Sequence, residues 1–72
     1  MTKKQALKEA IRRWGKTAAV EENRSVKKEY EYMRCRVGKI DLGMFFMVQG
    51  HGKTFEEAFQ DADKKKHLLT IE

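Results

Sequence analysis

The apolar residues of this chain change their spacing twice, and that change limits the folds it can adopt. Residues 2–14 repeat apolar side chains at intervals of three and four, as on one face of an α-helix, whereas residues 30–37 alternate as in a β-strand. A second helical segment begins at Thr54, where Glu57 three residues later completes a capping box. We therefore expect an α+β fold, with a three-stranded antiparallel sheet and two helices packed on one face, in the order α-β-β-β-α.

The two expected helices lie near the ends of the sequence. The first covers residues 3–14, with Thr2 as its N-cap and Gly15 as the residue that ends it. The second covers residues 55–67 and ends in the basic run 64–67, which favours the negative end of the helix dipole. Their buried sides are expected to be Ala6, Leu7, Ala10, Ile11 and Trp14 in the first helix, and Ala58, Phe59, Ala62 and Leu69 in the second.

Three strands are expected between the helices. The first covers residues 17–22 and is followed by a turn at 23–25, where Asn and Ser bond their own backbone. The second covers 30–37, a hairpin connection spans 38–43 between two glycines, and the third covers 44–49. In the second strand, alternation sends Met33, Cys35 and Val37 toward the helices and leaves Tyr30, Tyr32, Arg34 and Arg36 on a solvated face.

The length of the chain allows one small hydrophobic core. We expect a single domain over residues 1–72. Cys35 is the only cysteine, which excludes an intramolecular disulfide and favours a reducing compartment. No apolar segment has the length of a signal peptide core or a membrane span, so we expect a cytoplasmic protein without a membrane partner.

No group of residues predicts catalysis. His51 lies between two glycines, and neither His51 nor His67 has the spacing to Cys35 that a zinc site needs. The segment 50–54 contains Gly, Lys and Thr but lacks the spacer of a phosphate-binding loop. We expect no enzymatic activity, no metal, no cofactor and no small-molecule substrate.

Positive charge is concentrated in the first helix. The formal net charge is +5, and residues 1–16 alone carry six basic groups against Glu9. Such a helix attracts phosphate backbones, although a merely solvated helix face has the same composition. The candidate nucleic-acid-binding residues are Lys4, Lys8, Arg12 and Arg13 on the helix, Tyr30, Tyr32, Arg34 and Arg36 on the second strand, and Lys53.

The third expected strand is apolar on both faces. Met44, Phe46 and Val48 alternate with Phe45 and Met47, and one thin core cannot bury both sets. We expect one set to be exposed as a contact for a protein partner, a second copy of the chain or stacked bases. The alternative is that the end of the chain folds back over this strand, with Leu68, Leu69 and Ile71 covering it.

Several short motifs resemble the double-stranded RNA-binding domain. Leu7-Lys8-Glu9 resembles the Leu-x-Glu of that family's first helix. Gly50-x-Gly52-x-Thr54, followed by Ala58 and Ala62, resembles its Gly-x-Gly-x-Ser-Lys-Lys-x-Ala-Lys-x-x-Ala signature. The resemblance covers residues 2–67, and it implies the same α-β-β-β-α fold and RNA as the partner.

The chain departs from that family where RNA would bind. The lysines that contact phosphates at the start of the family's last helix correspond here to Phe55, Glu56 and Phe59, and residues 23–28 contain no Gly-Pro-x-His loop. A carboxylate at a phosphate site lowers affinity, because cations drive this binding. We expect the basic first helix and the Tyr and Arg strand face to replace the missing lysines.

Two functions follow from these patterns. The first is a small non-catalytic protein that binds RNA or DNA. DNA is included because residues 54–59, preceded by Leu42-Gly43-x-Phe45, resemble AP2 DNA-binding domains. That family lacks a helix like the one expected at 3–14. The alternative is a protein-interaction module or homodimer of the same fold that does not bind RNA. In either case, the small size suggests an accessory or regulatory protein of a phage or bacterium.

Overall fold

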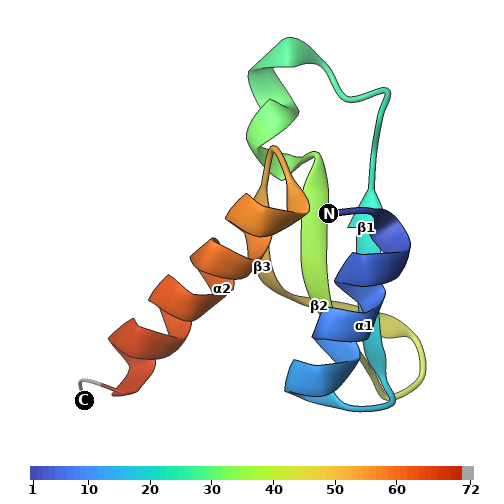
Figure 1. The fold of residues 1–72 in the computed structure, drawn as a ribbon, viewed down its shortest axis with the longest axis vertical. Coiled ribbons are helices and arrows are strands. Elements are labelled where there is room, and N and C mark those ends of the chain that lie inside the picture. Colours follow the sequence, from blue (N-terminus) through green and yellow to red (C-terminus); the bar gives the residue numbers. More distant parts are fainter. Residues whose placement is uncertain (71–72) are drawn as a thin grey trace.

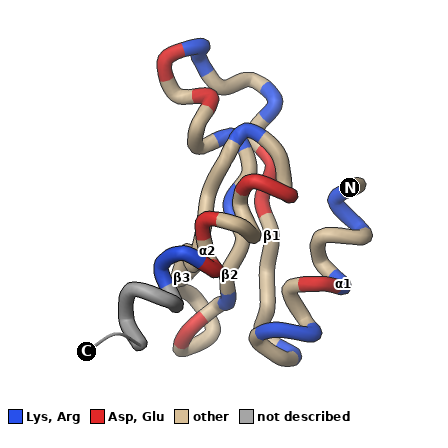
Figure 2. Tube along the Cα trace, turned by 60° about the vertical axis from the view of Figure 1, so that its left-hand side comes forward, with Lys and Arg blue, Asp and Glu red and all other residues tan. Residues whose placement is uncertain are grey.

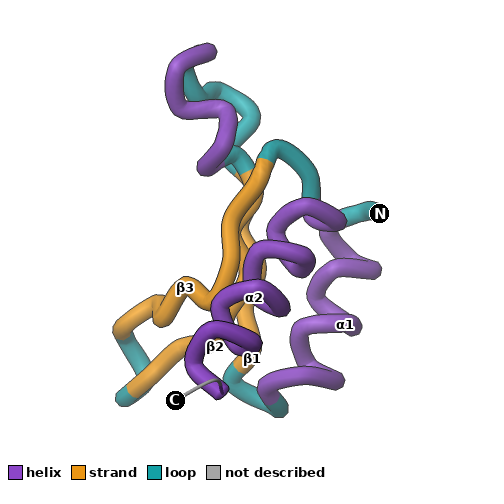
Figure 3. The backbone as a smooth tube through the Cα atoms, turned by 90° about the vertical axis from the view of Figure 1, so that its left-hand side faces the viewer, coloured by secondary structure: helices purple, strands orange, loops and turns teal. Residues whose placement is uncertain are grey.

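The chain folds into two helices and a three-stranded antiparallel sheet, as predicted (Figure 1). The computed structural model describes the backbone of residues 1–70 and the side chains of residues 1–65. The sheet has the order β1-β2-β3, and both helices lie on one of its faces (Figure 3). The elements are α1 (Lys3–Trp14), β1 (Ala18–Glu22), the 3-10 helix η1 (Lys28–Met33), β2 (Cys35–Asp41), β3 (Phe45–Gly52) and α2 (Phe55–Thr70).

Helix α1 has the predicted bounds, and its caps explain them. The Thr2 hydroxyl accepts a hydrogen bond from the Gln5 amide at 3.1 Å, while the Gln5 side chain accepts one from the Thr2 amide at 2.8 Å. This reciprocal pair satisfies two amides that no helical carbonyl can reach. At the other end, the Gly15 amide donates to the Ile11 carbonyl at 2.8 Å and closes the helix.

Helix α2 begins at the predicted residue and ends at Thr70, three residues beyond the prediction. The Thr54 hydroxyl accepts the Glu57 amide at 3.1 Å, as in a capping box. The Glu57 carboxylate, however, accepts the Lys53 amide at 2.9 Å, and so ties the preceding turn to the helix. The predicted roles of the side chains of Lys66, His67 and Leu69, and of the end of the chain, lie outside the described residues.

The predicted second strand is wrong in its first half. Residues 30–33 belong to η1, where the Tyr30 amide donates to the Lys27 carbonyl at 2.8 Å and the Arg34 amide donates to the Glu31 carbonyl at 3.0 Å. These local bonds occupy amides that a strand would offer to its neighbour. The segment 23–34, here called the arm, therefore extends beyond the sheet between β1 and β2 (Figure 1).

Strand β2 ends at Asp41 and so includes the first four residues, 38–41, of the predicted hairpin connection. Gly38 lies inside the sheet, where an added Cβ would come 2.1 Å from the Met47 carbonyl oxygen. The lack of a side chain at Gly38 therefore allows β2 and β3 to approach closely and does not mark a turn. Residues 42–44 connect the two strands, and the Met44 amide donates to the Asp41 carbonyl at 3.2 Å. The central residues of this turn, Leu42 and Gly43, have φ angles of 54° and 73°. Two consecutive positive φ angles are typical of a tight β-hairpin turn.

The core is built mainly from small side chains. Cys35 and Val37 of β2 point inward as predicted and pack with Ala6, Ala10 and the buried face of α2. Helix α2 lies directly on β3, because a Cβ at Gly50 would come 2.1 Å from the Ala58 carbonyl oxygen. Met33, which was also predicted to point inward, lies on η1 and is exposed.

The predicted buried stripe of α1 is only partly covered. Ala6 and Ala10 are buried, but Leu7 and Ile11 are 38% and 44% exposed. Helix α1 lies over β1, which is the first strand of the sheet, so no further strand lies beneath the outer flank of the helix. The predicted burial of Leu7 and Ile11 is therefore wrong.

Among the described residues, no helix combines the length and the apolar composition that crossing a membrane requires.

Candidate nucleic-acid interface

The predicted face of tyrosines and arginines is not formed. Tyr30 and Tyr32 lie on η1 and are half exposed, whereas Arg34 precedes β2 and Arg36 lies within it. The Tyr32 ring instead meets the His51 ring edge to face, with 5.7 Å between the ring centroids. The two tyrosines lie on η1, Arg34 lies between η1 and β2, and only Arg36 lies on the strand, so the prediction that the four side chains share one strand face is wrong.

The two arginines of that predicted face are engaged within the molecule. Arg34 lies 3.5 Å from the Glu31 carboxylate. Arg36 forms an ion pair with Glu21 on β1, and its guanidinium lies over the Phe46 ring at 5.9 Å from the centroid. A guanidinium held in this way has fewer donors left for a phosphate or a guanine edge.

The two arginines of α1 are also engaged. Both donate to the Glu9 carboxylate, Arg12 at 2.5 Å and Arg13 at 2.6 Å, and Arg13 also reaches Asp63 on α2 at 2.8 Å. Hydrogen bonds from Arg12 and Arg13 lower the pKa of Glu9 to about 2. The Arg13 guanidinium lies 4.7 Å from the centroid of the Phe59 ring. Arg13 thus ties α1 to α2.

The lysines differ from the arginines in this respect. Every arginine of the chain has a carboxylate within 4.0 Å, including Arg24, which pairs with Glu22. Of the lysines with described side chains, Lys53 and Lys65 have carboxylate partners, Glu31 and Asp61. Among the described residues, no carboxylate lies that close to Lys3, Lys4, Lys8, Lys16, Lys27, Lys28, Lys39 or Lys64.

Five of these eight lysines lie on α1 or the arm, namely Lys3, Lys4, Lys8, Lys27 and Lys28. Figure 2 shows basic segments along α1 and around the arm, and α1 begins at its end nearer the arm. Lys4 and Lys8, both predicted site residues, are exposed on α1, and Lys27 and Lys28 are exposed where η1 begins. Sequence reasoning missed Lys27 and Lys28 because it searched residues 23–28 only for a turn and for the family's Gly-Pro-x-His loop, which is absent there.

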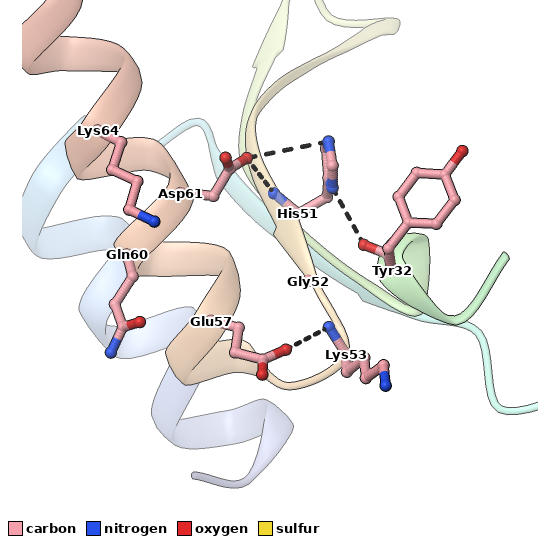
Figure 4. Close-up of a pocket in the computed structure, with 8 residues that line it drawn as sticks. All are labelled: Tyr32, His51, Gly52, Lys53, Glu57, Gln60, Asp61 and Lys64. Carbon is pink, nitrogen blue, oxygen red and sulfur yellow. Dashed lines mark hydrogen bonds and ion pairs between the residues drawn. The ribbon is translucent and has the colours of Figure 1, made fainter.

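A hollow beside α2 contains the remaining predicted residue, Lys53 (Figure 4). His51 Nδ1 lies 3.0 Å from the Tyr32 carbonyl oxygen, and the His51 amide donates to Asp61 at 3.1 Å. Burial acts to raise the pKa of Asp61, but the His51 amide and Lys65 together hold that pKa below its usual value. His51 therefore links the arm to β3 and α2.

The residues of α2 in this hollow were not among the predicted site residues. Glu57 and Asp61 are four positions apart, as are Gln60 and Lys64, so that one helix face carries all four. That spacing was a usable signal. Cys35, which was predicted to be a core residue, is buried, and its burial raises the pKa of the thiol.

No protein-family model matches the chain, and the searches of curated proteins and of solved structures also found no match. The resemblance to the double-stranded RNA-binding domain therefore stays a prediction from the motifs. Two of the family's lysine positions, Phe55 and Phe59, are buried in the core here.

Proposed function

We propose that this protein binds nucleic acid without catalysis, through the phosphate backbone and without reading the bases. One observation supports this proposal above the others: every arginine has a carboxylate partner, whereas the lysines of α1 and the arm have none among the described residues. Lysine is a point charge that neutralises phosphates, while sequence is read mainly by planar, bidentate groups.

The acidic start of α2 is compatible with this surface. Glu56 pairs with the amino group of Met1 at 2.7 Å, and the Glu57 carboxylate accepts the Lys53 amide at 2.9 Å. Both carboxylates therefore face a positive or donor group of the chain itself. Phosphates approaching Lys4 and Lys8 meet less repulsion than the sequence alone suggests.

The proposed surface differs from that of the RNA-binding family it resembles. That family uses the start of its last helix, where this chain has Phe55 and Phe59 in the core. Lys4 and Lys8 of α1, with Lys27 and Lys28 of the arm, take that role in our proposal. We place this activity in the reducing cytoplasm, as a chain with one thiol suggests.

A salt titration tests the proposal. Fluorescence anisotropy with a labelled 20-nucleotide single strand and with its duplex, between 50 and 200 mM salt, should show affinity falling linearly on logarithmic axes. Replacing Lys4 and Lys8 together by Gln should reduce the slope by roughly 1.4 for the single strand and roughly 1.8 for the duplex, which corresponds to two lost phosphate contacts.

The matched control removes the same charge elsewhere. Lys39→Gln with Lys64→Gln neutralises two exposed lysines on β2 and α2, and it should leave the slope nearly unchanged. An equal reduction of the slope in both double variants would show that only the total charge of the protein matters, and not a particular phosphate-binding surface. Absence of binding at 50 mM salt would refute the proposal.

The exposed hairpin supports a second candidate function, a protein-interaction module or homodimer. Leu42, Met44, Phe45 and Met47 are all exposed, and the hairpin end of β2 and β3 projects away from the helices (Figure 3). Contiguous apolar surface of this kind marks partner contacts. Sedimentation equilibrium should then show a dimer that Phe45→Ser dissociates; a monomer at all concentrations would exclude the homodimer.

A further inference from the structure

The outer edge of β1 offers unpaired backbone groups. The Ile40 amide donates to the Thr17 carbonyl and the Asn23 amide donates to the Arg34 carbonyl, both at 2.8 Å. Residues that bond the neighbouring strand alternate along an antiparallel ladder. The backbone groups of Val20 and Glu22 therefore point away from β2, at an edge that no other described strand covers.

An apolar groove runs along this edge, beneath the outer flank of α1. It is lined by Leu7 of α1 and by residues 18–20 of β1, and Ile11 lies one helical turn after Leu7. Leu7 and Ile11 continue the apolar stripe of Ala6 and Ala10, yet they are 38% and 44% exposed. The stripe is wider than the surface that one edge strand can cover.

Positive charge borders this groove, which we call the edge groove. Lys3 and Lys4 line it, and Lys8 lies one turn further along α1. The two carboxylates of β1 do not neutralise these lysines, because Glu21 pairs with Arg36 and Glu22 pairs with Arg24. An occupant with apolar side chains and negative charge complements both parts of this surface.

We propose that the edge groove binds an extended acidic peptide segment of a partner protein as a fourth strand beside β1. The peptide backbone bonds Val20 and Glu22, its apolar side chains pack under Leu7 and Ile11, and its carboxylates face Lys3 and Lys4. Strand addition of this kind obtains affinity from main-chain bonds and specificity from alternate side chains. The proposal is independent of nucleic-acid binding, although both use Lys4.

A second copy of this chain is a poorer occupant. Pairing two β1 strands side by side would bring the outer flanks of two α1 helices together. Lys4 and Lys8 lie beside Leu7 and Ile11 on that flank, so lysines would then face lysines. The charge pattern therefore favours an acidic partner over a copy of the chain.

An NMR titration of the ¹⁵N-labelled protein tests the proposal. The probe is an acetylated and amidated octapeptide of alternating Val and Asp. Its addition should slow hydrogen exchange at the Val20 and Glu22 amides, and binding should weaken as salt rises. Unchanged exchange at both amides under saturating peptide would refute strand addition.

Two serine substitutions provide a matched pair. Ile11→Ser and Met47→Ser each remove an apolar side chain that is 44% exposed, and serine is similar to isoleucine in helix propensity. Ile11→Ser should weaken peptide binding about tenfold, whereas Met47→Ser should not change it. Equal effects of both substitutions would contradict the assignment of the groove.

The remaining outcomes separate the other occupants. A peptide of alternating Val and Lys that binds as tightly as the acidic probe would refute the role of charge. A dimer that forms without peptide and is dissociated by Ile11→Ser would assign the groove to a second copy. Ile11→Ser should leave oligonucleotide binding intact, so loss of one activity leaves the other measurable.

Discussion

At the scale of single residues, the basic side chains fall into two groups with different roles. Arg13 belongs to the group that holds the fold together, because it bonds Glu9 within α1 and Asp63 on α2 while its guanidinium lies over Phe59. Lys4 and Lys8 on the same helix have no such contacts within the described residues. The sequence could show that α1 is basic, but the partner of each cation depends on which helix faces bring carboxylates within reach.

Glu9 gives a pH-dependent prediction. Its pKa falls from 4.5 to about 2 in the folded protein because Arg12 and Arg13 donate to its carboxylate. A lowered pKa stabilises the fold above the unfolded value, and this contribution is lost as the pH falls through the folded value. In urea unfolding, the stability difference between wild type and Glu9→Gln should be constant at neutral pH and should shrink between pH 4.5 and about 2. A difference that persists at full size at the acidic end would contradict this role.

At the scale of elements, helices and the first strand could be predicted from local signals, whereas the middle of the chain could not. The caps of α1 and the start of α2 depend on residues close in sequence, such as Thr2 and Thr54. The alternation of apolar and polar residues at 30–37 predicted one strand, but residues 30–33 form η1 instead. Hydrogen bonds within η1 take the place of the backbone bonds that a strand there would make to β1. Gly38 was assigned to a turn because its actual contact, the Met47 backbone, depends on the register of β3.

The β2–β3 turn gives a prediction at the same scale. Leu42 has a φ of 54°, a region that disfavours a leucine side chain, while Asn followed by Gly is preferred in such turns. Leu42→Asn should therefore raise the free energy of unfolding by roughly 0.5–1 kcal/mol in urea titrations. Met44→Asn, at a neighbouring exposed position, should give no such gain. Equal gains from both would point to removal of exposed apolar surface instead of turn geometry.

At the scale of the whole molecule, the predicted α-β-β-β-α order is confirmed, and the surface follows from how the layers meet. Helix α2 rests on Gly50 of β3, while α1 lies over the edge strand β1. That offset leaves Leu7 and Ile11 partly uncovered, although their spacing in the sequence fits a buried stripe. The spacing of apolar residues identifies which face of a helix is apolar, but it does not show how much of that face the sheet will cover.

The unequal pairing of arginines and lysines has a chemical consequence. Acetylation reaches primary amines and leaves guanidinium groups unchanged, so it would remove the charge of Lys4, Lys8, Lys27 and Lys28 while the Arg13 contacts between the helices remain. The lysine ion pairs that it would also remove are exposed and contribute little to stability. Lysine acetylation would therefore change the charge of the surface proposed to bind phosphates, while the arginine contacts that hold the two helices together stay in place.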